Sequence, residues 1–361
     1  MPFFSVNPDI SKAHTISTDV YKSVEFFEMA KEKIFANSWQ FISDTDQLDK
    51  GENLYPFTLL EDYLNEPLVI TKDANGQLNC LSNVCTHRGN ILVYEKCGAT
   101  NLKCKYHGRM FDLEGKFRSM PEFKEVKDFP TEKDDLTRLP IFLWNKFMFT
   151  TLEAKHDAGS FFQDMINRIA WLPLSDFMFR PDLSKEYVIK ANWALYCENY
   201  LEGFHIPFVH GDLNAALDFS DYDTEIFYPF SNLQLGIGKD EKNCFDIPES
   251  SPDFGKKVAA YYFWVFPNMM FNFYPWGLSI NIVQPIDVGK TKVQFLSYVW
   301  KDELRDKGAG GDLDKVEMED EEIVQQVQKG IQSRFYTSGR YSVTREKGTH
   351  HFHSLLAKFL Q

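Results

Sequence analysis

The chain of 361 residues lacks any apolar run that approaches the ~20 residues of a membrane-spanning helix, so no membrane insertion is expected. It also lacks an excess of positive charge, because 39 Lys and Arg stand against 52 Asp and Glu and give a net charge of −13. This balance argues against nucleic acid or an anionic membrane as the main partner. The first residues have neither the basic start nor the apolar run of a signal peptide, which favours a cytoplasmic protein.

Motifs for nucleotide binding are also missing. The sequence contains no G-x-G-x-x-G and no Walker loop, so the chain is not expected to bind a nicotinamide or a nucleotide itself. Cysteine is scarce, with six residues, and disulfides are not expected in a cytoplasmic chain of this size. Four of the six lie between positions 80 and 104, which favours a metal site built from thiolates.

The length suits two modest domains, and the local pattern changes along the chain. Residues 1–38 read as an N-terminal helical segment that packs on the C-terminal domain. Residues 39–150 show short apolar stretches between turn residues, which is typical of an all-β domain. Residues 151–361 mix helices and strands without regular βαβ alternation, which predicts an α+β domain. The expected helices cover 18–37, 192–205 and 314–333, and the expected strands cover 67–71, 77–81, 259–273, 279–283 and 291–300.

Two short Cys-His half-sites form the first chemical constellation. Cys85-Thr-His87 and Cys104-Lys-Tyr-His107 can each present one thiolate and one imidazole from a tight loop. Zinc would take all four groups on one tetrahedral ion. A Rieske [2Fe–2S] cluster would take the two Cys on one iron and the two His on the other. Cys80 and Cys97 fit neither half-site and are expected to pack in the domain interior.

A second constellation contains Glu202, His205 and His210. Glu202 and His205 are three residues apart and would share one face of a helix. His210 would lie about 140° further round an unbroken helix, so the two imidazoles could not reach one ion. Pro207 resolves this difficulty, because it should end or bulge the helix between the histidines. Two histidines with one acid would make a facial triad that leaves metal positions open for O2.

The acid is expected on the C-terminal helix, where four acidic residues are adjacent at 319–322. An apolar stripe runs through Val316, Ile323, Val324, Val327 and Ile331, and at about 100° per residue Asp320 falls in its middle. A carboxylate on a buried stripe needs a partner, and a metal ion is one. Asp320 is therefore the predicted third ligand, and the other three acids are expected on a solvated face.

The flanks of these residues resemble one protein family. Cys85-Thr-His-Arg-Gly and Cys104-Lys-Tyr-His-Gly are similar to the two cluster-binding loops of Rieske proteins. Asn-Trp at 192–193, the run Glu-Asn-Tyr-Leu-Glu-x-x-His-x4-His at 198–210 and a late acid before Gln-x-Gly complete the pattern. Over almost its whole length the chain resembles the oxygenase (α) subunit of Rieske non-heme iron oxygenases.

This resemblance implies an α+β fold: an N-terminal all-β Rieske [2Fe-2S] domain and a helix-grip, START-like catalytic domain with an antiparallel sheet, assembled as head-to-tail homotrimers. It implies that His205, His210 and Asp320 bind Fe(II). It also implies that Glu202 bonds the partner subunit's His107 and carries electrons between the centres, with Asn199 near the iron. O2 would be the co-substrate, and a separate reductase or ferredoxin would deliver electrons from NAD(P)H.

Two residues depart from the usual pattern of that family. Arg109 stands where many relatives carry Trp, and we expect it to alter docking of a redox partner. Glu202 stands where most relatives have Asp, which makes this chain similar to the carnitine-type members. The longer side chain is expected to change the coupling between the two centres.

The C-terminal half also resembles the choline, glycine betaine and carnitine monooxygenase branch, which implies hydroxylation of a quaternary ammonium compound with N-demethylation or C–N cleavage. Such cations favour aromatic cages, and Phe271, Phe273, Tyr274 and Trp276 are candidates for one, unless they form a packed strand. Two alternative functions stay open: an aromatic ring-hydroxylating dioxygenase, and a zinc-stabilised protein that binds a hydrophobic ligand. The histidine cluster at 350–353 is expected to have a surface or packing role.

Overall fold

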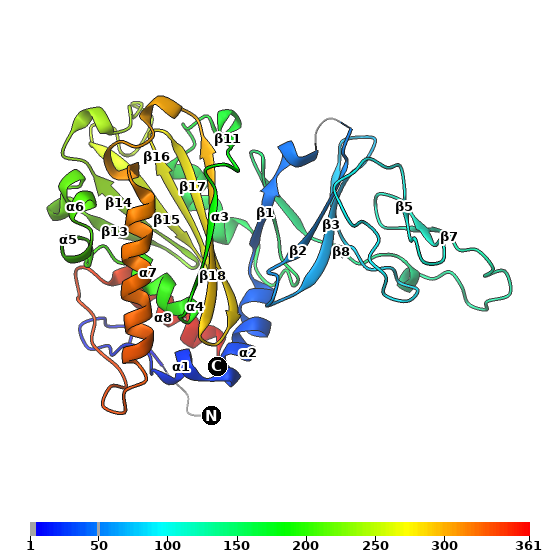
Figure 1. Ribbon diagram of the computed structural model, residues 1–361, viewed down its shortest axis with the longest axis horizontal. Helices are drawn as coiled ribbons and strands as arrows, with labels where there is room; N and C mark the ends of the chain where they lie inside the picture. Colours follow the sequence, from blue (N-terminus) through cyan, green and yellow to red (C-terminus); the bar gives the residue numbers. More distant parts are fainter. Residues whose placement is uncertain (1–4, 49–50) are drawn as a thin grey trace. The chain divides into compact units, whose positions relative to one another are not determined.

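The computed structural model describes residues 5–48 and 51–361, and these form two compact units. One unit is Ala36–Lys155, and the other combines the described residues before Ala36 with His156–Gln361. These divisions lie within five residues of the boundaries expected at 38/39 and 150/151. Figure 1 follows the chain through both units.

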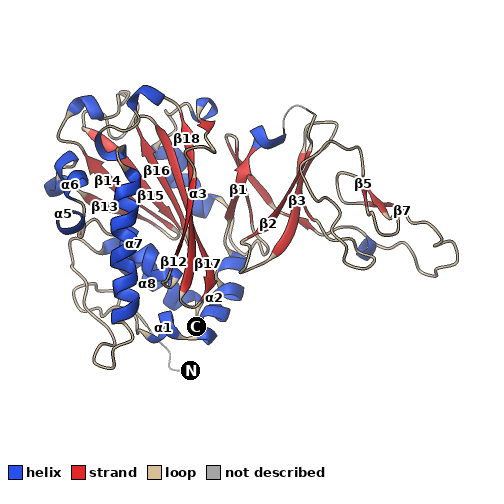
Figure 2. Cartoon of the chain, in the orientation of Figure 1, coloured by secondary structure: helices blue, strands red, loops and turns tan. Residues whose placement is uncertain are grey.

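The regular structure of the unit Ala36–Lys155 consists mainly of short antiparallel strands, which are joined by long loops (Figure 2). Its three sheets have the orders β1-β10-β9, β2-β3-β4-β8 and β5-β6-β7. The expected hairpin is present as β3 and β4, joined through a turn in which Gly76 has φ +81°. The strands are β1 (Gln40–Asp44), β2 (Leu54–Leu59), β3 (Glu66–Lys72), β4 (Leu78–Ser82), β5 (Leu102–Lys103), β6 (Met110–Phe111), β7 (Phe117–Ser119), β8 (Arg138–Leu139), β9 (Ile141–Trp144) and β10 (Phe147–Thr150).

The hydrophobic core of this unit includes both cysteines of the predicted metal site. Cys85 and Cys104, each 2 % exposed, pack in one apolar cluster with Val69, Leu81 and Phe111. Cys80 is fully buried in a neighbouring cluster. All six cysteines have free thiols.

The second unit is organised on an eight-stranded antiparallel sheet of order β11-β18-β17-β16-β15-β14-β13, with β12 also paired to β18. Figures 1 and 2 show these long strands side by side. The strands are β11 (Met178–Phe179), β12 (Lys185–Ile189), β13 (Asp223–Phe227), β14 (Ser231–Ile237), β15 (Val258–Val265), β16 (Met269–Tyr274), β17 (Gly277–Asp287) and β18 (Lys290–Val299). β15 and β16 are buried at every position, which explains their nearly continuous apolar sequence.

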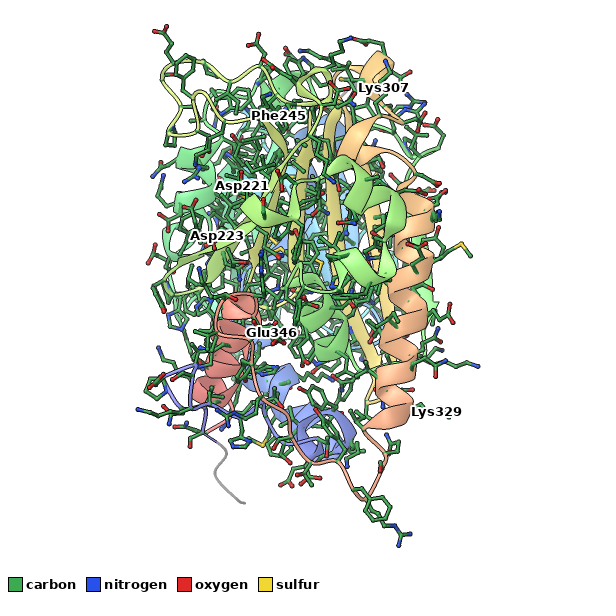
Figure 3. All side chains as sticks on the ribbon, turned by 90° about the vertical axis from the view of Figure 1, so that its left-hand side faces the viewer. Asp221, Asp223, Phe245, Lys307, Lys329 and Glu346 are labelled. Atoms are coloured by element: carbon green, nitrogen blue, oxygen red, sulfur yellow. The ribbon has the colours of Figure 1, made fainter. Side chains whose placement is uncertain are left out.

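Helices cover the sheet and hold the candidate site. The long helix α7 contacts α4, and α4 also contacts β17. In Figure 3 Lys329 marks one end of α7, and Glu346 directly precedes α8. The α-helices are α1 (Asp19–Lys22), α2 (Val24–Lys33), α3 (Gly159–Arg168), α4 (Trp193–Tyr200), α5 (Ile206–Val209), α6 (Gly211–Ala216), α7 (Leu313–Gly330) and α8 (Lys347–Phe359). No helix within the described residues is long and apolar enough to cross a membrane.

The α+β class with an all-β N-terminal part and an antiparallel catalytic sheet is therefore confirmed. Two element predictions are wrong in detail. The expected strand over 259–273 is two strands, β15 and β16, joined by a turn at 266–268. The expected helix over 192–205 begins correctly after Asn192, whose side chain accepts from the Ala194 N–H, but it ends at Tyr200.

Candidate active site

Two loops in the unit Ala36–Lys155 have the same backbone geometry. In the first loop, the Gly89 N–H donates to the Cys85 carbonyl at 3.0 Å. The Cys85 N–H donates to the carbonyl of Asn90, the residue after this glycine, at 2.8 Å. In the second, Gly108 and Cys104 repeat both bonds at 3.0 and 2.8 Å. The glycines have φ +69° and +75°, a conformation that favours glycine. The two half-sites are thus two loops with the same conformation, and each loop presents one Cys and one His.

The side chains on these loops have the features of metal ligands. The rings of His87 and His107 lie edge to face with centroids 4.8 Å apart, and the buried His107 Nδ1 has no hydrogen-bond partner among the described residues. The Asn90 side-chain amide donates to Cys104 Sγ at 3.7 Å. Burial opposes ionisation of Cys104, but the backbone N–H groups of Tyr106 and His107 outweigh it and lower the pKa of this thiol. Burial instead raises the pKa of the Cys85 thiol. A thiol that ionises more readily at Cys104 and an imidazole nitrogen without a partner at His107 both favour binding of a metal.

These donors suit two ions better than one. Among the residues that the structure describes, one group of three or more metal-binding side chains has all its donor atoms within 4.8 Å, and it lies in the other unit. In the two loops the donors are grouped by type: the thiols of Cys85 and Cys104 interact with each other, and the rings of His87 and His107 pack edge to face. This grouping suits a cluster with two Cys on one iron and two His on the other. The donor set therefore fits a [2Fe–2S] group better than a single tetrahedral zinc.

Arg109 lies inside the unit and not on its surface. Its side chain is 2 % exposed, pairs with Asp134 Oδ1 at 2.8 Å and lies within 5.0–5.6 Å of the rings of Phe111, Phe117 and Phe129. A buried guanidinium cannot itself form a docking surface, so the expected effect of Arg109 on docking of a redox partner could act only through the loop that it supports. Its ion pair connects Asp134, in the segment after β7, to the loop that contains Cys104.

In the other unit a turn, and not a helix, places Glu202 near His205. After α4 ends at Tyr200, the Glu202 carboxylate accepts from the backbone N–H groups of Phe204 and His205. The prediction that these residues share a helix face is therefore wrong. The short helix α5 follows, with Pro207 in its first turn, and the chain bends again at His210 before α6. The helix was expected to end or bulge between the histidines. It instead ends at Tyr200, before His205, and the separate short helix α5 lies between His205 and His210.

These bends bring His205, His210 and Asp320 together, with their donor atoms within 4.8 Å of one another. Asp320 Oδ1 lies 3.4 Å from His205 Nε2 and 3.0 Å from His210 Nε2. Each Nδ1 has its own carboxylate, Glu202 for His205 and Glu319 for His210, both at 2.8 Å. A carboxylate behind each histidine fixes which ring nitrogen faces the ion, an arrangement common in metal sites.

Helix α7 supplies two of these carboxylates. The Asp320 side chain is 14 % exposed and receives a hydrogen bond from Asn199 Nδ2 at 2.6 Å. The stripe used to predict Asp320 is narrower than expected, because Ile323 and Val327 are 37 % and 44 % exposed. Glu319 was expected on a solvated face, and it instead bonds His210.

The electrostatics of this group also favour a cation. Burial opposes protonation of His210, but its bonds with Asp320 and Glu319 outweigh burial and raise the pKa of the imidazole. Three carboxylates thus surround two imidazoles, and no Lys or Arg of the described chain lines the adjoining cavity. A divalent metal would neutralise this excess of negative charge.

A cavity opens beside the three residues, and all three form part of its lining. Helix α7 contributes Val316 and Glu317 to its lining, and the sheet contributes Asn272 and Asn281. The aromatic lining consists of five tyrosines: Tyr196, Tyr200, Tyr222, Tyr262 and Tyr274.

The predicted aromatic cage is largely wrong. Of its four members, only Tyr274 lines the cavity. Phe271 and Phe273 are fully buried in β16, and Trp276 stacks behind Tyr274 with centroids 5.4 Å apart. The sequence offered one signal that was missed, since Tyr196 and Tyr200 lie one turn apart on the helix that carries Asn199.

The histidines at 350–353 have the packing role that was expected. His353 is fully buried, bonded to Tyr341 at 2.6 Å and paired with Glu198 at 3.0 Å. His351 bonds the Pro229 carbonyl at 2.9 Å. Neither belongs to a group of metal-binding side chains among the described residues.

Comparison with known families agrees with both constellations. Residues 38–130 match the Rieske [2Fe-2S] domain, and residues 178–361 match the catalytic domain of the ring hydroxylating alpha subunit. The chain belongs to the ring-hydroxylating oxygenase alpha subunits. Members of this family are oxidoreductases that use a [2Fe–2S] cluster, mononuclear iron and O2.

Several named relatives of this alpha subunit cover its whole length. It is 29% identical to a chloroplastic choline monooxygenase of Arabidopsis thaliana, over 96% of this chain and 83% of that protein. It is 26% identical to the carnitine monooxygenase oxygenase subunit of Escherichia coli K12, over 98% and 96%.

Solved structures share the fold of this alpha subunit. The quaternary ammonium Rieske monooxygenase CntA with L-carnitine aligns with a TM-score of 0.76 at 24% identity, over 98% of this chain and 97% of that one. Naphthalene 1,2-dioxygenase with indole aligns with a TM-score of 0.72 at 18% identity, over 99% and 95%.

Proposed function

We propose that this chain is the terminal oxygenase of a Rieske system and that it hydroxylates a small quaternary ammonium compound at a carbon next to the nitrogen. The observation that carries the substrate class is the cavity beside His205, His210 and Asp320, which five tyrosines and the carboxylate of Glu317 line. Electron-rich rings and negative charge attract a quaternary ammonium group, which cannot donate a hydrogen bond. N-demethylation or C–N cleavage would follow such a hydroxylation.

In this proposal Cys85, His87, Cys104 and His107 hold the cluster. The unpaired Nδ1 of His107 and the lowered pKa of Cys104 support this assignment. The Asn90 amide directed at Cys104 Sγ would stabilise charge on that sulfur. The cluster would store one electron at a time for the second centre.

His205, His210 and Asp320 would hold Fe(II), which supplies the site where O2 is activated. The chain's own part is to orient these ligands. Glu202 and Glu319 hold each Nδ1, so that each Nε2 faces the ion. Asn199 donates to Asp320 and restricts the rotation of its carboxylate. Two histidines and one acid leave positions open for O2 and for water.

Electrons would come from a separate reductase or ferredoxin, and the oxygenase would assemble as a homotrimer. Glu202 would bond the partner subunit's His107 and connect cluster and iron. Two exposed rings support a protein contact near Glu202: Phe204 is 42 % and Phe208 is 80 % exposed, and they lie edge to face with centroids 6.2 Å apart. Tyr106, beside His107, is 58 % exposed. Large exposed aromatic groups of this kind mark protein interfaces.

The alternative of an aromatic ring dioxygenase has less support from the site. An uncharged arene gains nothing from the carboxyl group of Glu317, and it would leave polar groups of the lining without partners. No observation favours a zinc-stabilised binding protein, and the match of residues 38–130 to the Rieske [2Fe-2S] domain speaks against it.

A single-turnover experiment tests the proposed function. The anaerobic, iron-loaded protein is reduced chemically and then mixed with O2 and one candidate: choline, glycine betaine, L-carnitine or naphthalene. The proposal predicts consumption of at least one ammonium compound and recovery of naphthalene unchanged. Consumption of naphthalene with all three ammonium compounds intact would contradict it.

A further inference from the structure

Glu317 is the acidic group of the cavity that none of the roles above uses. It lies on α7, nearly one turn before Asp320, and its half-buried side chain lines the cavity. The Tyr196 hydroxyl donates to Glu317 Oε2 at 2.7 Å, and this is its one hydrogen bond from the described residues. A carboxylate can accept several bonds, so most of its capacity faces the cavity unused.

The surroundings of the cavity favour the neutral form of Glu317, and a cation bound in the cavity would favour the carboxylate. Tyr196, Tyr200 and Tyr274 line this cavity together with Glu317, and the Tyr196 hydroxyl bonds it directly. Burial, followed by the charge of Asp320, raises the pKa of Glu317 to about 8. No Lys or Arg of the described chain lines the cavity beside this half-buried acid, and acidic groups with perturbed pKa values cluster at sites that bind a ligand.

The lining also lacks the opposite charge. None of the described residues that form it is Lys or Arg. Its remaining polar groups include the neutral amides of Gln234, Asn272 and Asn281. These amides can bond a hydroxyl, but they cannot compensate the carboxylate of a zwitterionic substrate.

We infer that Glu317, with Tyr196, Tyr200 and Tyr274 around it, is the subsite for the cationic head of the substrate, and that the cavity selects a compound with net positive charge over a zwitterion. The substrate class is thus a quaternary ammonium alcohol and not a betaine. This inference rests on the proposed function and narrows it. Tyr196 acts as a positioning residue, because its hydroxyl holds the Glu317 carboxylate toward the cavity.

Three probes separate charge from shape. Choline carries the positive head, 3,3-dimethylbutan-1-ol replaces its nitrogen by carbon without charge, and glycine betaine adds a carboxylate. Dissociation constants are measured by calorimetry on the full-length, metal-loaded protein without O2, so that no turnover occurs. The wild type is expected to bind choline about tenfold or more tightly than the neutral alcohol, and more tightly than glycine betaine.

Glu317→Gln keeps the shape of the side chain and removes its charge. This variant is expected to lose most of the preference for choline over the neutral alcohol, while the affinity for the alcohol itself changes less than about twofold. Tyr196→Phe is expected to lower the preference by a smaller factor. Glu322→Gln, on the exposed side of the same helix, serves as the control and should behave as the wild type.

The outcomes distinguish the two proposals. If Glu317→Gln binds choline with unchanged preference over the neutral alcohol, the subsite assignment is wrong although the proposed function stands. If the wild type binds glycine betaine as well as choline, the selection by net charge is wrong. If the wild type consumes none of the ammonium compounds in the single-turnover experiment, the proposed function and this inference both fail.

Discussion

His210 Nδ1 lies 2.8 Å from Glu319 Oε2, and this contact leaves Nε2 of the same ring 3.0 Å from Asp320 Oδ1. Glu319 and Asp320 are adjacent on α7, yet they bond opposite nitrogens of one imidazole. The ring is therefore oriented entirely by one helix. Glu202 does the same for His205 from a turn of the chain, so each histidine has its own carboxylate.

Glu319→Gln is expected to weaken binding of mononuclear iron about 10–100-fold, because a neutral amide no longer makes the His210 imidazole more basic. Titration of the apoprotein with Fe(II) measures this affinity. Glu322→Gln removes the same charge from an exposed position of α7 and is the matched control. Equal iron affinity in both variants would show that Glu319 plays no part in the metal site.

His107→Ala and Asp320→Ala are expected to separate the two centres. His107→Ala should lose the visible spectrum of the cluster, since it removes one of its four proposed ligands. Asp320→Ala should keep that spectrum but lose mononuclear iron and turnover, because two histidines alone hold Fe(II) weakly. Metal analysis together with absorption spectra checks both expectations. Full iron content and activity in Asp320→Ala would overturn the assignment of the third ligand.

Glu202→Gln tests the proposed link between cluster and iron. The amide oxygen can still accept from His205, so both centres should remain bound. Loss of the charge is expected to slow transfer from the reduced cluster by at least about tenfold, measured as cluster oxidation in a single turnover. An unchanged rate with both metals present would refute the bridging role.

His351, which is not one of the proposed metal ligands, is expected to make the stability of the protein depend on pH. Burial lowers its pKa to about 4, and its ring packs against Tyr228 and Trp264 while Nε2 faces the Pro229 carbonyl. As the pH falls, His351 is protonated near pH 6.5 in the unfolded chain but only near pH 4 in the folded protein. The burial of neutral His351 therefore contributes no loss of stability above pH 6.5, and the free energy of unfolding decreases as the pH falls from 6.5 toward 4. The expected loss is roughly 2–3 kcal/mol.

Urea unfolding at several pH values measures this loss. His351→Gln should remove this part of the pH dependence, whereas His350→Gln, whose ring bonds the Asn7 carbonyl near the surface, should retain it. An identical pH dependence in His351→Gln and the wild type would contradict the assignment.

Arg109→Met is expected to destabilise the unit Ala36–Lys155 by about 2–3 kcal/mol, because it leaves Asp134 without its partner and empties the space between three Phe rings. Arg118→Met, which breaks an ion pair whose guanidinium is 60 % exposed, should cost less than about 1 kcal/mol. Urea unfolding of both variants compares the two. Equal losses would show that the buried pair has no special role.

Much of this architecture could be predicted from the sequence because the decisive residues are close together along the chain. Cys85 with His87, and Cys104 with His107, are local patterns whose loop geometry depends on nearby glycines. The α+β class and the major strands follow from local apolar patterns. The triad required one long-range step, the placement of Asp320 by helical periodicity.

What could not be predicted depends on tertiary packing. Glu319 reads as a solvated residue from the helix alone, and only the position of His210 gives it a partner. The cavity tyrosines come from separate helices and strands, so no local pattern connects Tyr196 with Tyr262. Arg109 gives no sign of burial in the sequence, because its partner Asp134 lies 25 residues later.

The central claim is that one chain holds two different iron centres. Iron and acid-labile sulfide are measured per chain in anaerobically purified, reconstituted protein. The account predicts about three irons and two sulfides, with a Rieske-type electron paramagnetic resonance signal after reduction. Protein that binds zinc in place of iron and contains no labile sulfide would contradict it.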